Sequence, residues 1–340
     1  MSTSIAQFTT LRLGGPVGRI VTAETTAELI AALREVDAEG APLLLIGGGS
    51  NLVVGDEGWP GTALLIRTRG VEVELGDERV RVKVAAGESW DDLVARSVAE
   101  KWSGLAAMSG IPGLVGATPV QNVGAYGSEV ADVLESVTVY DRRSGSVESW
   151  PAVQCEFAFR SSVFKHTDRY VVLDVTFLLP FSAEAPPIRY AELAARLGVP
   201  LGGVAAADQV RQAVLTLRKN KGMLLDEDDH DAWSVGSFFV NPIVEQAQAP
   251  AQCPQWPVGD KVKLSAAWLI EQAGFGRGFG LDRGRGRVAV STKHTLALTN
   301  RGEATTRELL DLALEIREGV QAKFGIRLGP EARLAGCALD

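Results

Sequence analysis

The sequence predicts a mixed α and β protein with more than one domain. Its 340 residues are too many for one ordinary core, because domains typically hold about 100–200 residues. Hydrophobic residues make up 46% of the chain and charged residues 22%, a balance typical of folded proteins. Segments with helical periodicity alternate with short segments typical of strands. We therefore expect an α+β protein of two or three domains.

The first part of the chain has the pattern of a small α/β unit. We expect a helix over residues 20–40, because Thr25 and Glu28 have the spacing of a capping box and Gly40 is a common residue after a last helical turn. Residues 41–46, APLLLI, then predict a short apolar strand that leads directly into three glycines. Helix and strand at this spacing indicate an α/β unit.

The middle of the chain is expected to form a second unit. Valine alternates with Arg81 and Lys83, as on a half-buried strand. Ser89 is placed to cap a helix. Residues 136–150 predict a hairpin, and residues 170–179 predict a buried strand.

The last part of the chain is expected to form a third unit. It begins near Asp208 with an amphipathic helix. The final helix is predicted to begin at Thr305, with Glu308 as its capping partner, and to end at Gly325. Residues 326–328 are expected to form a closing strand.

Charge and cysteine usage exclude several classes of protein. Lys and Arg total 34 against 42 for Asp and Glu, a formal net charge of −8, whereas sequence-independent nucleic-acid binding needs an excess of basic residues. No run of about 18 apolar residues occurs, and the N-terminus lacks the pattern of a secretory signal. Three cysteines stand far apart, at positions 155, 253 and 337. We expect a cytoplasmic protein with no nucleic-acid or membrane partner, no disulfide framework and no metal site.

The first glycine strip, residues 47–51 (GGGSN), directly follows a predicted strand. Consecutive glycines let backbone N–H groups surround an anion, and Ser50 and Asn51 add side-chain donors, which suits a pyrophosphate. The strip is not a Rossmann fingerprint, because Leu52 stands where a third glycine is required, and no Walker A motif occurs. Taken alone, a tight turn between strands explains the strip equally well.

The second glycine strip, residues 109–127 (SGIPGLVGATPVQNVGAYG), carries five glycines. Its small side chains allow it to lie along an extended ligand, and Thr118, Gln121 and Asn122 add hydrogen-bonding side chains. Two such strips in separate units suit a long dinucleotide held at a domain junction, although the pair fits any dinucleotide.

Five motifs follow one another along the chain: GGGSNLVV, SGIPGLVGATPVQNVGAYG, FRSSVFK, GSFFVNP and GPEARLAG. In this order they resemble the UDP-N-acetylenolpyruvoylglucosamine reductase family over nearly the whole chain. The resemblance implies two FAD-binding units in a fold similar to that of vanillyl-alcohol-oxidase-type (PCMH-type) flavoproteins, and an α/β substrate-binding domain. The implied FAD-binding units are residues 1–69 with 325–340, and residues 70–207. The implied substrate domain is residues 208–324.

The resemblance also implies FAD as the cofactor and NADPH as a co-substrate. Covalent flavin attachment uses a histidine or cysteine, and neither occurs in the glycine strips, so we expect non-covalent FAD. The residues expected to bind FAD are Gly47, Gly48, Gly49, Ser50 and Asn51 of the first strip, with Ser109, Gly110, Ile111, Pro112, Gly116, Ala117, Thr118, Asn122, Gly124 and Ala125 of the second.

The implied reaction begins when NADPH reduces the flavin and leaves. The enolpyruvyl sugar nucleotide then enters and accepts hydride at its vinyl methylene carbon. Negative charge then develops at the adjacent carbon and is shared with the carboxylate. Protonation of that carbon completes the reaction. The product is UDP-N-acetylmuramate, a precursor of peptidoglycan. This chemistry needs a flavin, charge stabilisation at a carboxylate and a positioned acid.

Three residues match the catalytic positions of that family. Arg160 would grip the enolpyruvyl carboxylate with its planar fork, Ser237 would donate the proton, and Glu331 would assist the enol or align Arg160. Each also fits an ordinary role: a surface salt bridge, a strand-end cap and a paired edge-strand carboxylate. The family usually has tyrosine before the arginine, and Phe159 replaces it here, which removes a hydroxyl group.

Four further residues match substrate-binding positions: Tyr190, Arg218, Lys221 and Asn241. Tyr190 matches the longer subclass, in which a tyrosine loop closes over the nucleotide sugar. Arg218 and Lys221 would meet diphosphate or carboxylate groups. Apart from the resemblance, Lys221 fits a solvated helix end and Tyr190 a half-buried loop anchor.

Two other functions remain open from the sequence. The first is another FAD-dependent oxidoreductase of the same fold, which would reduce oxygen readily and need no set of Arg160, Ser237 and Glu331. The second is a nucleotide-sugar binding protein without catalysis, which would be colourless when purified. For the reductase, we expect a monomer whose partners are small molecules, the nucleotide sugar and NADPH.

Overall fold

The computed structural model describes residues 3–340, which form two compact units. Unit 1 holds the described residues of Met1–Gly18 together with Gly49–Pro60 and Asn220–Asp340. Unit 2 holds Arg19–Gly48 and Gly61–Lys219. The three-part division expected from the sequence is not tested by these two units and stays a prediction.

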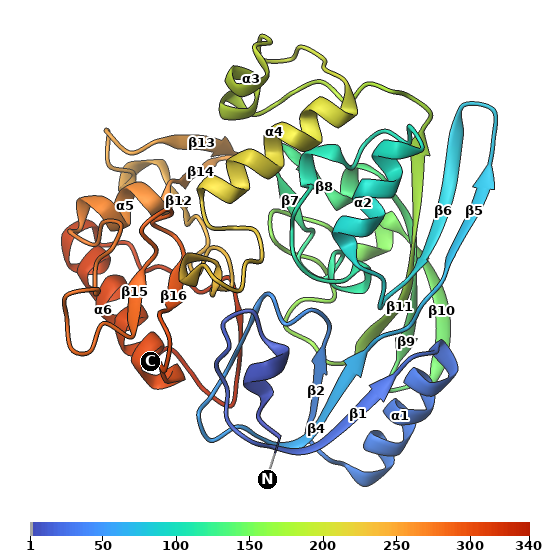
Figure 1. Ribbon diagram of the computed structural model, residues 1–340, viewed down its shortest axis with the longest axis horizontal. Coiled ribbons are helices and arrows are strands. Elements are labelled where there is room, and N and C mark those ends of the chain that lie inside the picture. The colour runs from blue at the N-terminus through green and yellow to red at the C-terminus, as the bar shows by residue number, and fades with distance from the viewer. Residues whose placement is uncertain (1–2) are drawn as a thin grey trace. The chain divides into compact units, whose positions relative to one another are not determined.

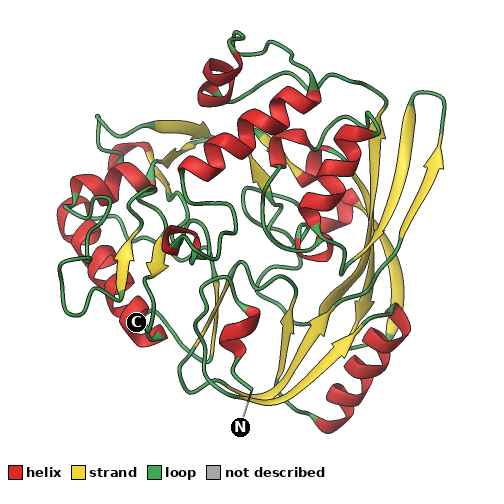
Figure 2. Ribbon diagram, viewed as in Figure 1, coloured by secondary structure: helices red, strands yellow, loops and turns green. Residues whose placement is uncertain are grey.

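The largest element of unit 2 is a five-stranded antiparallel sheet (Figures 1 and 2). Its strands follow the order β10 (Ser146–Pro151), β9 (Leu134–Asp141), β11 (Tyr170–Pro180), β6 (Arg79–Ala85) and β5 (Val71–Leu75). The predicted hairpin, the strand with alternating valines and the long buried strand are all confirmed. Strand β6 hides one face because its valines recur at every second position, whereas most residues of β11 are buried.

Helix α2 (Trp90–Ala99) packs its apolar side on this sheet. Ser89 caps the helix as predicted, since its side chain accepts a hydrogen bond from the amide of Asp92. Trp90 is fully buried, and its ring lies 6.0 Å from that of Phe177 on β11. The tryptophan therefore fixes the first turn of α2 against the sheet.

Helices α3 (Ala191–Leu197) and α4 (Ala207–Asn220) share a separate core in unit 2, which includes Leu193 and Val210. The helix predicted to begin near Asp208 is confirmed as α4. Its residues up to Lys219 belong to unit 2. In Figure 1, α3 lies beside α4, and residues 198–206 join the two helices.

A three-stranded sheet of order β1 (Val17–Ala23), β4 (Trp59–Ile66) and β2 (Leu43–Ile46) accompanies helix α1 (Thr26–Glu39). The predicted capping box of Thr25 and Glu28 forms, and Gly40 ends the helix in the left-handed conformation. The start predicted at residue 20 is wrong, because residues 20–23 belong to β1. An N-cap residue has an extended backbone, so the chain ahead of Thr25 is available to pair as a strand.

Two helices pack together in the core of unit 1 (Figure 1). They are α5 (Ala266–Gln272) and α6 (Thr306–Phe324). The prediction for α6 is confirmed, with a capping box of Thr305 and Glu308 and a left-handed Gly325 at the end. Its apolar side is buried with the phenylalanines that follow Ser237.

The strands of unit 1 are short. One sheet has the order β12 (Ile243–Glu245), β14 (Lys261–Leu264) and β13 (Gln255–Val258), and two further pairs are β15 (Val288–Val290) with β16 (Leu298–Asn300) and β3 (Leu52–Val54) with β17 (Arg333–Ala335). The strand predicted over residues 326–328 is wrong. Ile326 and Leu328 are buried in the core without strand pairing, and the closing strand is β17, parallel to β3. Burial of alternate side chains alone thus produced the strand-like pattern.

In residues 3–340, no helix has the length and apolar character that crossing a membrane would require.

Candidate active site

In unit 2, Gly47 and Gly48 emerge from the end of β2 next to the second glycine strip. The carbonyl of Gly47 accepts a hydrogen bond of 2.9 Å from Arg67. Within residues 3–340, the main-chain N–H groups of Gly47 and Gly48 donate to no other residue. A Cβ atom on Gly48 would lie 2.7 Å from the Cα atom of Gly113. The two predicted strips therefore meet backbone to backbone, and glycine is required for this approach.

The second strip is fastened to the start of α2. Trp90 donates from its indole nitrogen to the carbonyl of Met108 and from its main chain to the carbonyl of Gly113, each over 3.1 Å. The amides of Val115 and Gly116 donate to carbonyls just before Trp90, each over 2.9 Å. The strip is consequently held in one shape by main-chain groups rather than left as a loose loop.

Polar side chains of the second strip direct their donors into unit 2. Thr118 donates to the carbonyl of Val115 over 2.8 Å, and Asn122 donates to Glu129 over 2.7 Å. The side-chain oxygen of Asn122 accepts from the amide of Ala131. These intramolecular hydrogen bonds fix the shape of the strip. The FAD contacts expected at Thr118 and Asn122 stay predictions. Main-chain atoms, or the hydroxyl oxygen of Thr118 as an acceptor, would have to make them.

Arg160 lies against the second strip. Its Nη2 donates to the carbonyl of Gly124 over 2.6 Å, and its Nη1 lies 3.4 Å from the carbonyl of Asn122. Gly124 belongs to the short hairpin of β7 (Gly124–Ala125) and β8 (Ser128–Glu129). The guanidinium carbon is also 5.3 Å from the ring centre of Phe159. Arg160 is thus oriented by the strip that the sequence assigns to the cofactor.

Three residues of this area have a backbone conformation that is unusual for residues other than glycine. Asn122, Tyr126 and Arg160 have φ values of 44°, 50° and 52°, a region that residues other than glycine rarely occupy. Such strain persists only where the surroundings enforce it, and it commonly occurs at functional sites. Arg12, Lys101, Glu156, His166 and Glu303 also have positive φ values, so this strain accompanies the motifs of unit 2 without being confined to them.

Tyr190 stands at the start of α3 and contacts Tyr126. Their rings meet edge to face, with centres 5.4 Å apart, and 43% of Tyr190 is exposed. Burial raises the pKa of Tyr126 to about 12. The pair gives Tyr190 an anchor while leaving its exposed side available to a ligand.

Arg218 on α4 is only 8% exposed. Its Nε donates to the carbonyl of Gly110 over 3.1 Å, and burial lowers its pKa. Arg218 thus lies beside the second strip and helps to hold Gly110 in place. Its role toward the substrate stays a prediction.

Ser237 and Glu331 come together in unit 1. The amide of Glu331 donates to the carbonyl of Phe238 over 2.8 Å, and Phe239 forms a β-bridge with Pro330. Ser237 itself is half-buried and forms a β-bridge with Ala297. Its hydroxyl has no hydrogen-bond partner among residues 3–340. Two predicted catalytic residues from remote parts of the sequence are therefore neighbours.

The first strip continues into the same part of unit 1 through Asn51. The side chain of Asn51 lies 3.4 Å from the carbonyl of Glu331, and its own carbonyl accepts from the amide of Arg333 over 3.0 Å. These contacts extend the parallel pairing of β3 with β17. The segment that is expected to bind FAD is therefore attached to the segment that carries Glu331.

Two predicted substrate contacts in unit 1 have different surroundings. The side-chain oxygen of Asn241 accepts a hydrogen bond of 2.9 Å from the amide of Ala266, at the start of α5. Lys221 is half-buried and directly follows α4. Asn241 therefore has a structural role, and the substrate contacts expected of both residues stay predictions. Arg160 belongs to unit 2, so its convergence with Ser237 and Glu331 also stays a prediction.

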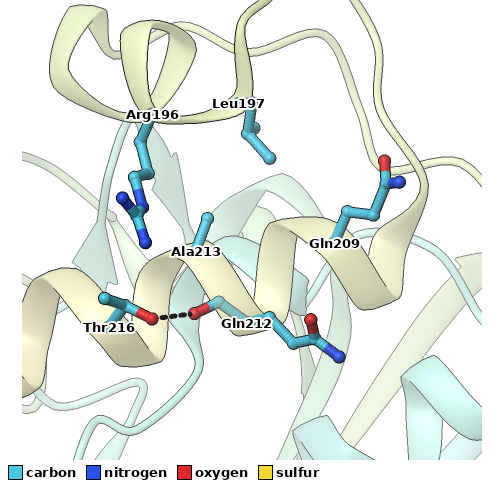
Figure 3. A pocket seen from close by; sticks show the side chains of 6 residues that line it. All are labelled: Arg196, Leu197, Gln209, Gln212, Ala213 and Thr216. Atoms are coloured by element: carbon cyan, nitrogen blue, oxygen red, sulfur yellow. Dashed lines mark hydrogen bonds between the residues drawn. The ribbon is translucent and has the colours of Figure 1, made fainter.

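A pocket of about 310 Å³ lies between α3 and α4, and Figure 3 shows Arg196 of α3 pointing toward α4. Its lining consists of Arg196, Leu197, Gln209, Gln212, Ala213 and Thr216. None of the residues predicted from the motifs lines it, so it does not define the active site. Among residues 3–340, no group of three His, Cys, Asp or Glu side chains is arranged to hold a metal ion.

The residues of the two strips fit FAD. In the described part of the chain, the main-chain amides of Gly47 and Gly48 are free to donate to a ligand, and the close approach of Gly48 to Gly113 leaves no side chain in the way. Main-chain N–H groups of this kind bind the phosphates of a pyrophosphate. The comparison with known proteins agrees. Residues 17–149 match the family described as an FAD binding domain, and residues 228–335 match the C-terminal domain of UDP-N-acetylenolpyruvoylglucosamine reductase. Fold and site thus define an FAD-dependent oxidoreductase.

Curated relatives narrow the class to one family. The UDP-N-acetylenolpyruvoylglucosamine reductase of Saccharopolyspora erythraea is 52% identical, with 99% of this chain and 95% of the relative covered. The reductase of Salinispora arenicola is 51% identical, with coverages of 98% and 95%. The chain belongs to the UDP-N-acetylenolpyruvoylglucosamine reductase family. A crystal structure of the enzyme from Thermus caldophilus shares the fold, with a TM-score of 0.65, 24% identity and 98% of each chain covered.

Proposed function

We propose that this chain uses NADPH to reduce the enolpyruvyl group of UDP-N-acetylglucosamine-enolpyruvate. The product is the lactyl ether UDP-N-acetylmuramate, a precursor of peptidoglycan, and the reaction takes place in the cytoplasm. Family membership at about 50% identity and the FAD binding domain support this function. The observation that carries it is the pairing of the Ser237 segment with the Glu331 segment inside unit 1.

When bound, FAD would supply hydride transfer from NADPH to the substrate. The chain's part is to hold the cofactor by the amides of Gly47 and Gly48 and by the second strip. Glycines at these positions would let the backbone approach the pyrophosphate, and the apolar second strip would help to exclude water from the bound cofactor. Residues Gly49, Ser50 and Asn51 complete the first strip.

The substrate carboxylate binds to Arg160 in this proposal. A guanidinium binds a carboxylate with two parallel hydrogen bonds, and the attraction grows as negative charge builds on the carboxylate. The contact of Arg160 with the carbonyl of Gly124 orients the guanidinium plane beforehand. Such preorganised donors stabilise developing charge without having to rearrange during the reaction.

The proton comes from the hydroxyl of Ser237. A serine is a weak acid, but a carbon bearing negative charge is a strong base, so position matters more than acidity. The hydroxyl of Ser237 is not engaged by any residue within 3–340, and the next two residues, Phe238 and Phe239, are buried with ring centres 5.0 Å apart. Glu331 lies beside this segment and assists the enol.

The nucleotide sugar contacts Tyr190, Arg218, Lys221 and Asn241 in this proposal. Tyr190 belongs to the tyrosine loop and closes over the sugar nucleotide, with Tyr126 as its anchor. Positive charge at Arg218 and Lys221 favours the diphosphate. The enzyme works as a monomer with small molecules as its only partners.

A product assay tests this function. Purified protein is mixed with NADPH and UDP-N-acetylglucosamine-enolpyruvate, and UDP-N-acetylmuramate is measured by mass spectrometry. We expect product in equal amount to the NADPH consumed. NADPH consumption without this product, or oxygen consumption with a simple alcohol and no NADPH, would instead indicate another flavin-dependent oxidoreductase.

A further inference from the structure

We propose that Asp91 is a positioning residue for FAD, because it holds Gly110 of the second glycine strip in its binding shape. Asp91 acts together with Arg211, and neither residue belongs to a sequence motif. The inference rests on the proposed function, since it takes the second strip to be part of the FAD site.

The carboxylate of Asp91 makes three charge-assisted hydrogen bonds inside unit 2. Its Oδ1 accepts from the amide of Gly110 over 2.6 Å and from Nη1 of Arg211 over 2.7 Å. Its Oδ2 accepts from Nη2 of Arg211 over 2.9 Å. Arg211 on α4 therefore binds the carboxylate through both terminal nitrogens of its guanidinium group, and the same carboxylate binds the amide of Gly110 in the second strip.

Gly110 is held from its other side as well. Its carbonyl accepts from Nε of Arg218, also on α4, over 3.1 Å. The N–H and C=O of one residue belong to two successive peptide planes, so fixing both planes fixes the backbone angles between them. Gly110 has a φ of 69°, the left-handed conformation. The two clamps thus set the turn that leads into Ile111 and Pro112.

The charge of Asp91 is maintained by these contacts. Burial opposes its ionisation, but the hydrogen bonds from Arg211 and from the amide of Gly110 outweigh burial and lower its pKa. An exposed ion pair alone contributes little to stability. A carboxylate that also accepts a hydrogen bond from a main-chain amide contributes more, because its loss leaves that amide without its partner and frees the loop to move.

Unit 2 offers a matched control for the ion pair. Asp37 accepts from Nε and Nη2 of Arg142 over 3.0 and 2.5 Å. The side chains of Arg142 and Asp37 are 18% and 27% exposed, against 18% and 34% for Arg211 and Asp91. Asp37 contacts neither glycine strip among the described residues. Loss of either carboxylate therefore breaks a similar ion pair, but only one loss releases the strip.

The experiment compares FAD release from purified holoenzyme of the wild type, Asp91→Ala and Asp37→Ala. Release is followed by the rise in flavin fluorescence after dilution, well below the unfolding temperature of each variant. We expect FAD release at least about tenfold faster in Asp91→Ala, as for loss of one charge-assisted hydrogen bond, and unchanged release in Asp37→Ala. Both variants should unfold at slightly lower temperature.

A second variant covers the case in which Asp91→Ala does not fold. Asp91→Asn keeps an oxygen that can accept from Gly110 but loses the charge, so an intermediate release rate is expected. Equal release from the wild type and both Asp91 variants would overturn the proposal, as would equally fast release from the Asp91 and Asp37 variants. Wild-type protein that purifies without FAD would instead contradict the proposed function.

Discussion

The main-chain amide of Glu331 donates to the carbonyl of Phe238 over 2.8 Å. This bond joins two segments that are far apart in the sequence and brings Glu331 beside Ser237. The contact is made by backbone atoms, so it does not depend on the charge of the glutamate. Side-chain substitutions at either residue can therefore test chemistry while the local pairing is kept.

Removing the hydroxyl of Ser237 should slow product formation but not flavin reduction. We expect Ser237→Ala to lose about 10²–10⁴-fold in product formation, the usual contribution of a positioned acid, while NADPH still bleaches the flavin at the normal rate. Stopped-flow spectroscopy separates the two steps. Ser149→Ala, on the exposed side of β10, is the control, and normal turnover in Ser237→Ala would remove Ser237 from the acid role.

Replacing the carboxylate of Glu331 by an amide should also impair the reduction of the substrate. We expect Glu331→Gln to lower the rate about 10²–10³-fold, as for loss of one group that stabilises developing charge. The pairing of the two segments should persist, because the main-chain bond to Phe238 is retained. A rate within twofold of the wild type would assign Glu331 a structural role only.

Adding a methyl group at Gly48 should weaken FAD binding. The new Cβ atom would lie 2.7 Å from the Cα atom of Gly113, and a clash with backbone must push the strips apart. Overpacking of this kind costs about 1–3 kcal/mol, so the FAD content of Gly48→Ala after dialysis should fall. Gly276→Ala, where the added atom meets nothing within 4 Å, should retain FAD fully. Full retention by both variants would show that the strips need not touch.

The stability contribution of Asp91 should depend on pH. Burial opposes ionisation, yet hydrogen bonds from Arg211 and Gly110 hold the pKa of Asp91 below its ordinary value. A lower pKa in the folded state contributes stability above the unfolded pKa of about 4, and this contribution is lost as pH falls through the folded pKa.

Urea unfolding of the wild type and Asp91→Asn measures this dependence. The difference in unfolding free energy should be largest at neutral pH and should shrink below about pH 4. A difference that stays constant across this range would show that the charge of Asp91 does not contribute.

Local sequence signals predicted helices well and strands less well. The capping boxes at Thr25 and Thr305 gave helix starts that the structure confirms, because capping depends on a few neighbouring residues. Strand pairing depends on distant partners. For this reason the residues of β1 were assigned to the helix that follows it, and the alternating burial of Ile326 and Leu328 was taken for a strand.

The candidate site was predictable only in part. Both glycine strips stood out from the sequence by their composition, whereas Ser237 and Glu331 were identified only through the resemblance to a family, because their local sequences also fit ordinary structural roles. The clamp of Asp91 and Arg211 did not stand out, because an acidic residue in a first helical turn is common and its partner lies 120 positions away. The inward bonds of Asn122 likewise follow only from the folded loop.

Anaerobic half-reaction spectroscopy tests the proposed function most directly. The yellow enzyme is first reduced with NADPH and the excess is removed, and UDP-N-acetylglucosamine-enolpyruvate is then added without oxygen. The proposed function predicts that the flavin absorbance returns as UDP-N-acetylmuramate forms. A flavin that stays reduced with the enolpyruvyl nucleotide, and recovers only when air is admitted, would contradict it.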